Sequence, residues 1–187
     1  MPKDLLMLKD ARSSINVIPS AVEESRGATC CNFAGCLDSA RHEQMIMSGK
    51  ILTREFSIDN YDAALQLWQR VEGLEVAEGD DREGVAQFVT RNPGLSRVAI
   101  DGSTVVGVAM CGHDGRRGYI YHLAVDPAYR RYGFGKRLVQ ECLDGLRRVG
   151  IVRAIILVAD CNLGGAEFWK GAGWEDIPGA VPMGIDV

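Results

Sequence analysis

The chain has 187 residues, of which 47% are hydrophobic, and carries a formal net charge of −4 at pH 7. This length is enough for one domain with a sizeable core, and the hydrophobic share is typical of globular proteins. No apolar run reaches the roughly 18 residues of a membrane span, and the N-terminus is too polar for a signal peptide, so we expect a cytoplasmic protein. The acidic balance argues against nucleic acid as the main partner.

Residues 1–50 show neither helical nor strand periodicity, and we expect most of them to be disordered. The stretch "NVIPSAVEESRGA" resembles a translated bacterial intergenic repeat, which suggests spurious upstream translation and a true start at Met45 or Met47. The cysteines at 30, 31 and 36 lack a paired Cys-x-x-Cys spacing, so we predict no metal site.

Residues 51–187 have regular patterns and predict a single domain. Alternation in 51–57 indicates a strand, and apolar residues at helical spacing in 57–73 indicate a helix capped by Ser57 or Asp59. A short helix follows at 82–91. Three strands are predicted next: two within 96–115, joined by an Asp-Gly-Ser hairpin turn, and a third in 116–127 that ends at a proline.

The C-terminal part begins with an amphipathic helix at 136–150. The apolar segment 152–160 is typical of a buried strand, and 162–173 predicts a short helix. Segments 174–177 and 180–187 are read as two closing strands. Antiparallel strands followed by a strand–helix–strand unit predict an α+β, or mixed α/β, class.

The loop "RRYGFG" (130–135) directly precedes the helix at 136–150. Backbone N–H groups at a helix start can bind a pyrophosphate, and glycines allow close approach. A phosphate-binding P-loop would need a hydroxyl residue after Lys136, where Arg137 stands. A dinucleotide-binding Rossmann loop would need a third glycine at Leu138, although Asp160 mimics its ribose-binding acid and keeps that alternative open.

The segment "LAVDPAYRRYGFGKRL" resembles motif A of the GNAT superfamily of N-acetyltransferases, whose Arg/Gln-x-x-Gly-x-Gly/Ala pattern falls on residues 130–135. The segment "NLGGAEFWKGAGW" resembles the late motif of the same family, with Asn162 at its asparagine and Trp169 where tyrosine is usual. The resemblance covers residues 51–187 and is closest to small bacterial acetyltransferases of the YpeA type.

This resemblance implies a GNAT fold, a twisted and mostly antiparallel sheet with a splayed parallel strand pair and about four helices. It also implies acetyl-CoA as co-substrate and direct transfer to a primary amine of a small molecule, peptide or protein. A catalytically silent acyl-CoA-binding module is the alternative, and a homodimer is one expected assembly. The residues expected at the cofactor are Leu123, Ala124, Val125, Arg130, Arg131, Tyr132, Gly133, Phe134, Gly135, Lys136, Asn162 and Trp169.

The catalytic residues are the least defined part of the sequence. Strand alternation predicts Tyr119, Tyr121 and Leu123 on one face, and Ile120, His122 and Ala124 on the other. The two tyrosines would order a water and line an amine pocket, and His122 is interpreted as a satisfied core histidine. Indole cannot transfer a proton at ordinary pH, so Trp169 leaves the general acid unassigned. Six acids within 71–83 favour a cationic acceptor. His113, Asp114, Glu72 and Glu75 remain alternative bases.

Overall fold

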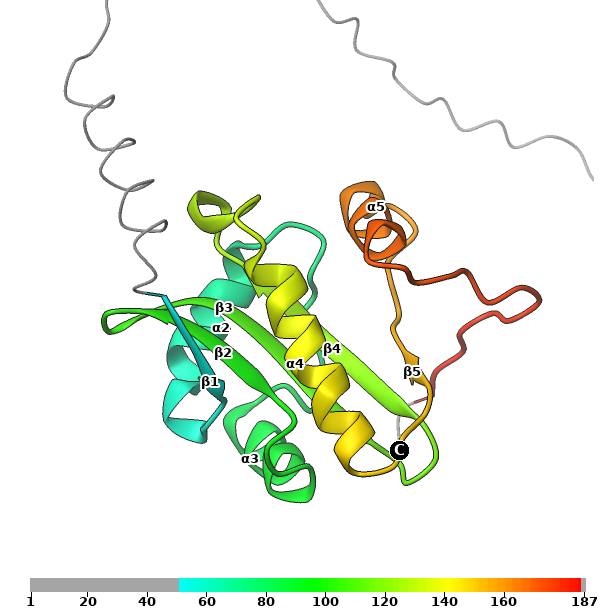
Figure 1. Cartoon of the computed structure of the whole chain (residues 1–187), viewed down its shortest axis with the longest axis horizontal. Helices are drawn as coiled ribbons and strands as arrows, with labels where there is room; N and C mark the ends of the chain where they lie inside the picture. The colour runs from blue at the N-terminus through cyan, green and yellow to red at the C-terminus, as the bar shows by residue number, and fades with distance from the viewer. Residues whose placement is uncertain (1–50, 186–187) are drawn as a thin grey trace, which may run out of the picture.

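A computed structural model describes residues 51–185, which form one five-stranded sheet with helices on both faces (Figure 1). The sheet order follows the chain: β1 (Leu52–Glu55), β2 (Arg97–Asp101), β3 (Thr104–His113), β4 (Gly118–Val125) and β5 (Ala154–Ile155). The helices are α2 (Tyr61–Arg70), α3 (Arg82–Arg91), α4 (Phe134–Arg148) and α5 (Leu163–Gly171), with 3-10 turns η1 (Ile58–Asn60) and η2 (Pro127–Tyr129). The predicted mixed class is confirmed.

The core consists of two apolar clusters, one on each face of the sheet. On one face, Leu138, Cys142 and Leu146 of α4 pack against small and branched residues of the central strands. On the other face, Leu67 and Trp68 of α2 are fully buried against β2, β3 and β4. Burial of each large side chain contributes about 1.5–3 kcal/mol, so these two helices fix the position of β4 between them.

The strand pairing changes direction at the end of the sheet. The first three pairs are antiparallel, whereas β4 and β5 run parallel and pair only at Gly118–Ala154 and Tyr119–Ile155. Beyond that point the two strands separate, and the chain after β5 runs away from β4 to α5 (Figure 1). The β4 backbone after Tyr119 therefore has no strand partner on its β5 side among the described residues.

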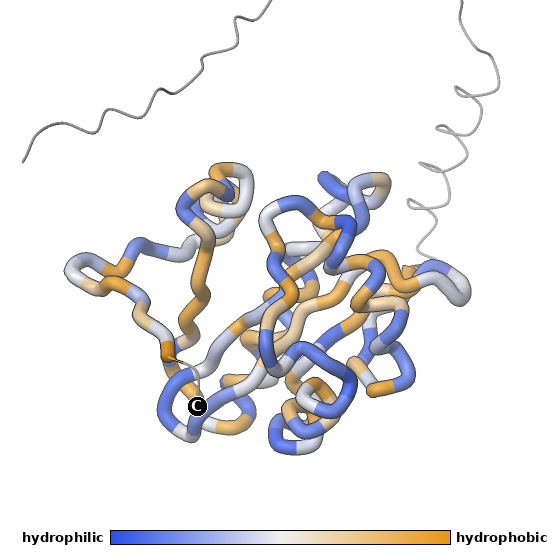
Figure 2. The backbone as a smooth tube through the Cα atoms, turned by 180° about the vertical axis from the view of Figure 1, so that it is seen from behind, coloured by the Kyte–Doolittle hydropathy of each residue, from blue (hydrophilic) through white to orange (hydrophobic). Residues whose placement is uncertain are grey.

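Two sequence predictions about the C-terminal part are wrong. The predicted buried strand at 152–160 is reduced to two paired residues, and Val152 and Leu157 are 96% and 74% exposed. Neither predicted closing strand, at 174–177 or within the described part of 180–187, has strand pairing. Figure 2 shows that the apolar backbone near β5 lies apart from the main layers, so residues 51–185 provide no second layer to bury it.

The helix boundaries are mostly as predicted. The helix at 82–91 and the short helix after Asn162 are confirmed, while α4 begins two residues earlier than predicted, at Phe134. The residue before α2 is Asn60, because Ser57 instead caps the 3-10 turn η1 that precedes the helix. No helix in residues 51–185 is long and apolar enough to cross a membrane. The predictions for residues 1–50 lie outside the described residues.

Candidate active site

A β-bulge interrupts β4 at the centre of the sheet. Val108 pairs with Ala124 and Met110 with Tyr121, so Ala109 of β3 faces two residues of β4, His122 and Leu123. His122 has a φ of 45°, a left-handed conformation that is uncommon for a residue other than glycine. The bulge breaks the strict alternation that the sequence predicts for this strand.

The bulge reverses the predicted orientation of His122. Its imidazole contacts the Trp68 ring at 4.7 Å between centroids and so lies on the same face as α2. Leu123 and Val125 instead pack against the α4 cluster, while Ala124 is buried on the α2 face. The prediction that His122 and Ala124 share a face is correct, but the prediction that Leu123 lies with the tyrosines is wrong, because the extra residue shifts the pattern by one.

His122 pairs with a carboxylate from the acidic loop between α2 and α3. Its Nε2 lies 2.7 Å from Oδ1 of Asp80, and both side chains are about four-fifths buried, with 17% and 18% exposed. Asp80 is held in place by two further bonds, because its Oδ2 accepts from the Ala77 N–H and its carbonyl accepts from the Tyr61 hydroxyl. In the sequence Asp80 lies within the acidic stretch 71–83, and no local pattern indicates that it meets His122.

The predicted catalytic tyrosines lie beside this pair. Tyr119 and Tyr121 stack with centroids 6.0 Å apart, and Tyr121 also meets the edge of Phe88 on α3. Burial, followed by the negative charges around it, raises the pKa of Tyr121 above its ordinary value of 10.0. The phenol therefore stays protonated at neutral pH, where it can donate a hydrogen bond but cannot serve as a base. Its aromatic surface is suited to lining an acceptor pocket.

The glycine loop before α4 has the backbone conformation of an anion cradle. Arg131 and Gly133 have φ values of 68° and 86°, and Gly133 is the N-cap of α4. The first recorded backbone bond of the helix runs from the Arg137 N–H to the Gly133 carbonyl. The earlier N–H groups of the first turn have no intrahelical acceptor, and they carry the partial positive charge of the helix start. Successive N–H groups in such a turn form an anion-binding concavity.

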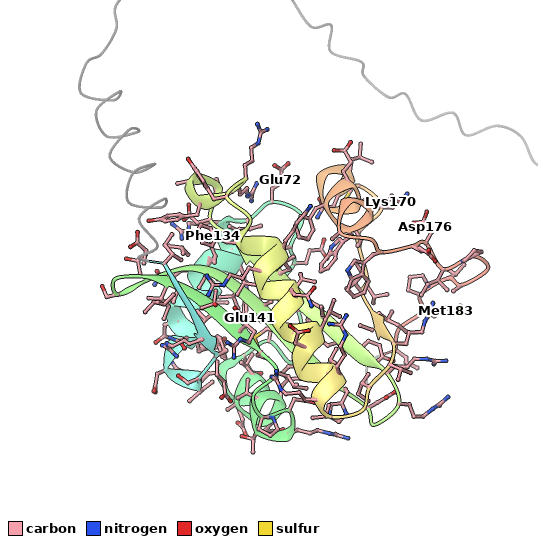
Figure 3. All side chains as sticks on the ribbon, viewed as in Figure 1. Glu72, Phe134, Glu141, Lys170, Asp176 and Met183 are labelled. Carbon is pink, nitrogen blue, oxygen red and sulfur yellow. The ribbon has the colours of Figure 1, made fainter. Side chains whose placement is uncertain are left out.

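Charged side chains surround this cradle. Arg131 and Lys136 are exposed and form no ion pair with the described residues, whereas Arg130 donates from Nε to the Val125 carbonyl at the end of β4. Tyr132 and Phe134 are half-buried and pack against the α4 cluster, which anchors the loop. Figure 3 labels Phe134 at the first turn of α4. The loop thus combines a fixed backbone with two cations available to a phosphate.

Helix α5 lies against the start of α4. A Cβ added at Gly135 would lie 3.2 Å from the Phe168 ring, so this glycine permits the close contact of the two helices. Trp169 is half-buried between Phe168 and Trp174. Asn162 caps α5 by accepting from the Gly165 N–H, and its side-chain amide donates to the Gly73 carbonyl on the acidic loop. Asn162 therefore joins the two sides of the site, and its predicted contact with the cofactor stays a prediction.

The alternative bases lie in less suitable places. His113 pairs with Gly118 at the other end of β4, four residues along the strand from His122, and its Nδ1 accepts from the Gly115 N–H. Asp114 accepts the N–H groups of Arg116 and Arg117, which lower its pKa below the ordinary 3.8 and mark it as a turn residue. Glu72 and Glu75 are exposed on the acidic loop, and Figure 3 shows Glu72 projecting from it.

The arrangement resembles that of solved acetyltransferases. The structure of the PaiA N-acetyltransferase from Thermoplasma acidophilum in complex with coenzyme A superimposes with a TM-score of 0.60 at 20% identity, over 69% of this chain and 93% of that chain. At this identity the likeness concerns the fold. The sheet that opens between β4 and β5, with α4 beside it, thus shares its fold with this acetyltransferase.

Sequence comparison gives the family. Residues 61–174 match the model of the acetyltransferase (GNAT) family. An acetyltransferase from Yersinia pestis (strain Pestoides F) is 31% identical over 109 residues, which cover 58% of this chain and 77% of that protein. One from Sodalis glossinidius (strain morsitans) is 34% identical over 109 residues, covering 58% and 76%. The chain belongs to the GNAT family of acetyltransferases, whose acyl donor is an acyl-CoA, and the alternative of a dinucleotide-binding Rossmann loop is wrong.

Proposed function

We propose that this protein transfers the acetyl group of acetyl-CoA directly to a primary amine of a cationic acceptor. The observation that carries the proposal is the meeting of an unpaired β4 edge with the first turn of α4. The unpaired edge can accept the amide groups of pantetheine as a strand would, and the helix start can bind the pyrophosphate. A ligand with an amide-containing arm and a pyrophosphate at its end could bind the β4 edge and the start of α4 at the same time.

The donor side would use mainly backbone groups. Leu123, Ala124 and Val125 supply the edge, and residues 130–136 supply the cradle, with Arg131 and Lys136 adding charge-assisted bonds. A backbone N–H beyond the bulge would polarise the thioester carbonyl in the manner of an oxyanion hole. Trp169 and Asn162 remain proposed contacts with the donor from the α5 side.

The acceptor side would lie on the α2 and α3 face of β4. Tyr119, Tyr121 and Phe88 provide aromatic surface there. The glutamates at 72, 75 and 78 are exposed on the loop whose Asp80 reaches β4, so their field extends over the same place. Negative charge around an aromatic pocket favours a cationic amine over a neutral or acidic one.

The test is a thiol-release assay. The purified protein is incubated with acetyl-CoA and a panel of polyamines, aminoglycosides, lysine-containing peptides and peptides with free N-termini, and free CoA thiol is measured. We expect turnover with at least one cationic amine, and mass spectrometry should show its acetylated product. Thermal stabilisation by CoA is measured in parallel, with NAD as the control nucleotide.

The outcomes separate the alternatives. Stabilisation by CoA without thiol release on any amine would favour a silent acyl-CoA-binding module. Stabilisation by NAD but not by CoA would overturn the assignment of the cradle. Turnover confined to neutral or acidic amines would support the acetyltransferase activity but contradict the proposed preference for cationic acceptors.

A further inference from the structure

We propose that the Asp80–His122 pair is the general base of the reaction, with His122 as the catalytic residue and Asp80 as its positioning residue. This inference rests on the proposed transfer to an amine and assigns the group that removes the ammonium proton. The pair stands on the α2 face of β4 beside Tyr121, at the bulge that follows the last β4–β5 pairing.

The contacts of Asp80 determine which nitrogen of His122 can accept a proton. The carboxylate receives the Ala77 N–H on Oδ2, which leaves Oδ1 to accept from the imidazole at 2.7 Å. Because an ionised carboxylate only accepts hydrogen bonds, Nε2 carries the ring proton in the neutral histidine. The lone pair is then on Nδ1, which has no hydrogen-bond partner among the described residues. This is the division of roles that a base and its orienting carboxylate require.

The backbone at His122 indicates that this orientation is specifically maintained. A non-glycine residue at φ 45° is strained, and such strain persists only where the surrounding contacts determine it. The bulge places Tyr121 and His122, two consecutive residues, toward the same face, which regular strand geometry forbids. The aromatic surface and the proposed base thereby lie on the same face of β4 at adjacent positions.

Trp68 provides a second, independent observation. Its ring contacts His122, its side chain is fully buried, and its Nε1–H has no hydrogen-bond acceptor among the described residues. Buried donors without an acceptor are rare in folded proteins. We infer that a buried water completes this bond, which would place a polar group in the interior beside the ring that His122 packs against.

The proposed step balances. The acceptor ammonium gives one proton to Nδ1 of His122, directly or through a water, and the imidazolium is stabilised by Asp80. The amine nitrogen then attacks the thioester carbon, the N–C bond forms, and the C–S bond breaks with CoA leaving as thiolate. The second proton of the amine nitrogen passes to the thiolate through solvent, and His122 returns its proton to solvent. One amide, one thiol and one net proton result.

The first test replaces His122 with residues that keep the fold. In His122→Gln the side-chain amide can still donate to Asp80, but it cannot take a proton. General-base catalysis contributes about 10²–10⁴-fold, so we expect kcat to fall by that factor with little change in the KM of acetyl-CoA. His122→Gly suits the positive φ, and added imidazole should partly restore its rate. His113→Gln is the matched control and should retain the wild-type rate.

The second test concerns Asp80. In Asp80→Asn the amide oxygen accepts from the Ala77 N–H, and the NH₂ group then faces the imidazole. His122 must present a lone pair to it from Nε2, so its proton moves to Nδ1 and the base is in the wrong tautomer. We expect a fall in kcat comparable to that of His122→Gln, and no further fall in the double variant. Asp81→Asn, which preserves the α3 N-cap, should leave kcat unchanged.

These results separate the pair from the proposed function. Thermal stabilisation by CoA must persist in all variants, which shows that they fold and bind the donor. A kcat within threefold of wild type in His122→Gln would overturn the base while leaving the acetyltransferase intact. Additive losses in the double variant would overturn the coupling to Asp80. Absence of thiol release by the unaltered protein would overturn both proposals.

Discussion

The two sides of the candidate active site are built in different ways. The proposed donor cradle is one contiguous stretch, residues 130–136, and would work through backbone N–H groups that left-handed residues orient. The proposed acceptor side joins Asp80 to His122, 42 positions apart, and would work through side chains. The geometry of the cradle depends on having no side chain that blocks its backbone N–H groups. The geometry of the Asp80–His122 pair depends on the packing of α2 against β4. Each side should therefore fail under a different kind of substitution.

The largest expected effect is on the donor side. Gly135→Glu places a carboxylate where the cradle would hold a pyrophosphate, and like charges so close cost several kcal/mol. We expect the affinity for CoA to fall more than about 100-fold, measured by isothermal titration. Gly135→Ala is the control, because it adds the same close contact with Phe168 without the charge. Equal losses of CoA affinity in the two variants would assign the effect to helix packing. An unchanged affinity in Gly135→Glu would disprove the proposed pyrophosphate-binding role of the loop.

A smaller effect is expected from the backbone alone. Gly133→Ala keeps open space around its Cβ but forces a side chain into φ 86°, which costs about 1–2 kcal/mol of unfolding free energy. Urea denaturation measures this loss. Gly164→Ala, inside α5 and also without a close neighbour, should instead gain roughly 0.5–1 kcal/mol. The same sign for both substitutions would contradict a conformational role for Gly133.

On the acceptor side, the loop glutamates can be neutralised without touching Asp80. The combined variant Glu72→Gln, Glu75→Gln and Glu78→Gln should raise the KM of a cationic acceptor roughly threefold to tenfold at low salt. The KM of acetyl-CoA should not change, because the proposed donor cradle lies outside this loop. High salt should abolish the difference, since it screens exposed charges. A difference that persists at high salt would indicate direct contact with the acceptor.

The smallest effect concerns a region that both sides share, the α4 scaffold. Burial alone would raise the pKa of Glu141, but hydrogen bonds from Thr53, Arg97 and Arg137 outweigh it and hold the pKa below the ordinary 4.5. The lowered pKa stabilises the fold above pH 4.5, and this contribution is lost as pH falls through the folded-state value. Glu141→Gln should therefore be less stable than wild type at pH 7.

The difference between Glu141→Gln and wild type should narrow in acid, as the Glu141 carboxylate takes up its proton. Urea unfolding at pH 7 and pH 3 provides the comparison. Asp144→Asn, which alters an exposed pair with Arg147, should stay close to wild type at both pH values. A gap that does not change with pH would show that packing, and not the charge of Glu141, stabilises this helix.

The sequence by itself determined the elements whose signal is local. Helical spacing defined α2 and α4, the Asp-Gly-Ser turn defined the β2–β3 hairpin, and the glycines at 133 and 135 marked the proposed cradle. In each case a short stretch of sequence is enough to produce the element. The causes are periodic burial of apolar side chains, a turn that needs small residues, and a positive φ that favours glycine. The family resemblance rested on the same windows.

Only the tertiary structure decided the position of His122, which carries the proposed base, and the extent of the last strand. No glycine in the sequence indicates the bulge at His122. The bulge follows from packing β4 between α2 and α4 in register with β3. Asp80 meets His122 because a loop closes over the sheet. Segment 152–160 has the composition of a buried strand, yet burial needs a second layer beyond it, and the described chain provides none. Local sequence patterns determine which secondary structure a segment can form, and tertiary packing determines which residues it contacts.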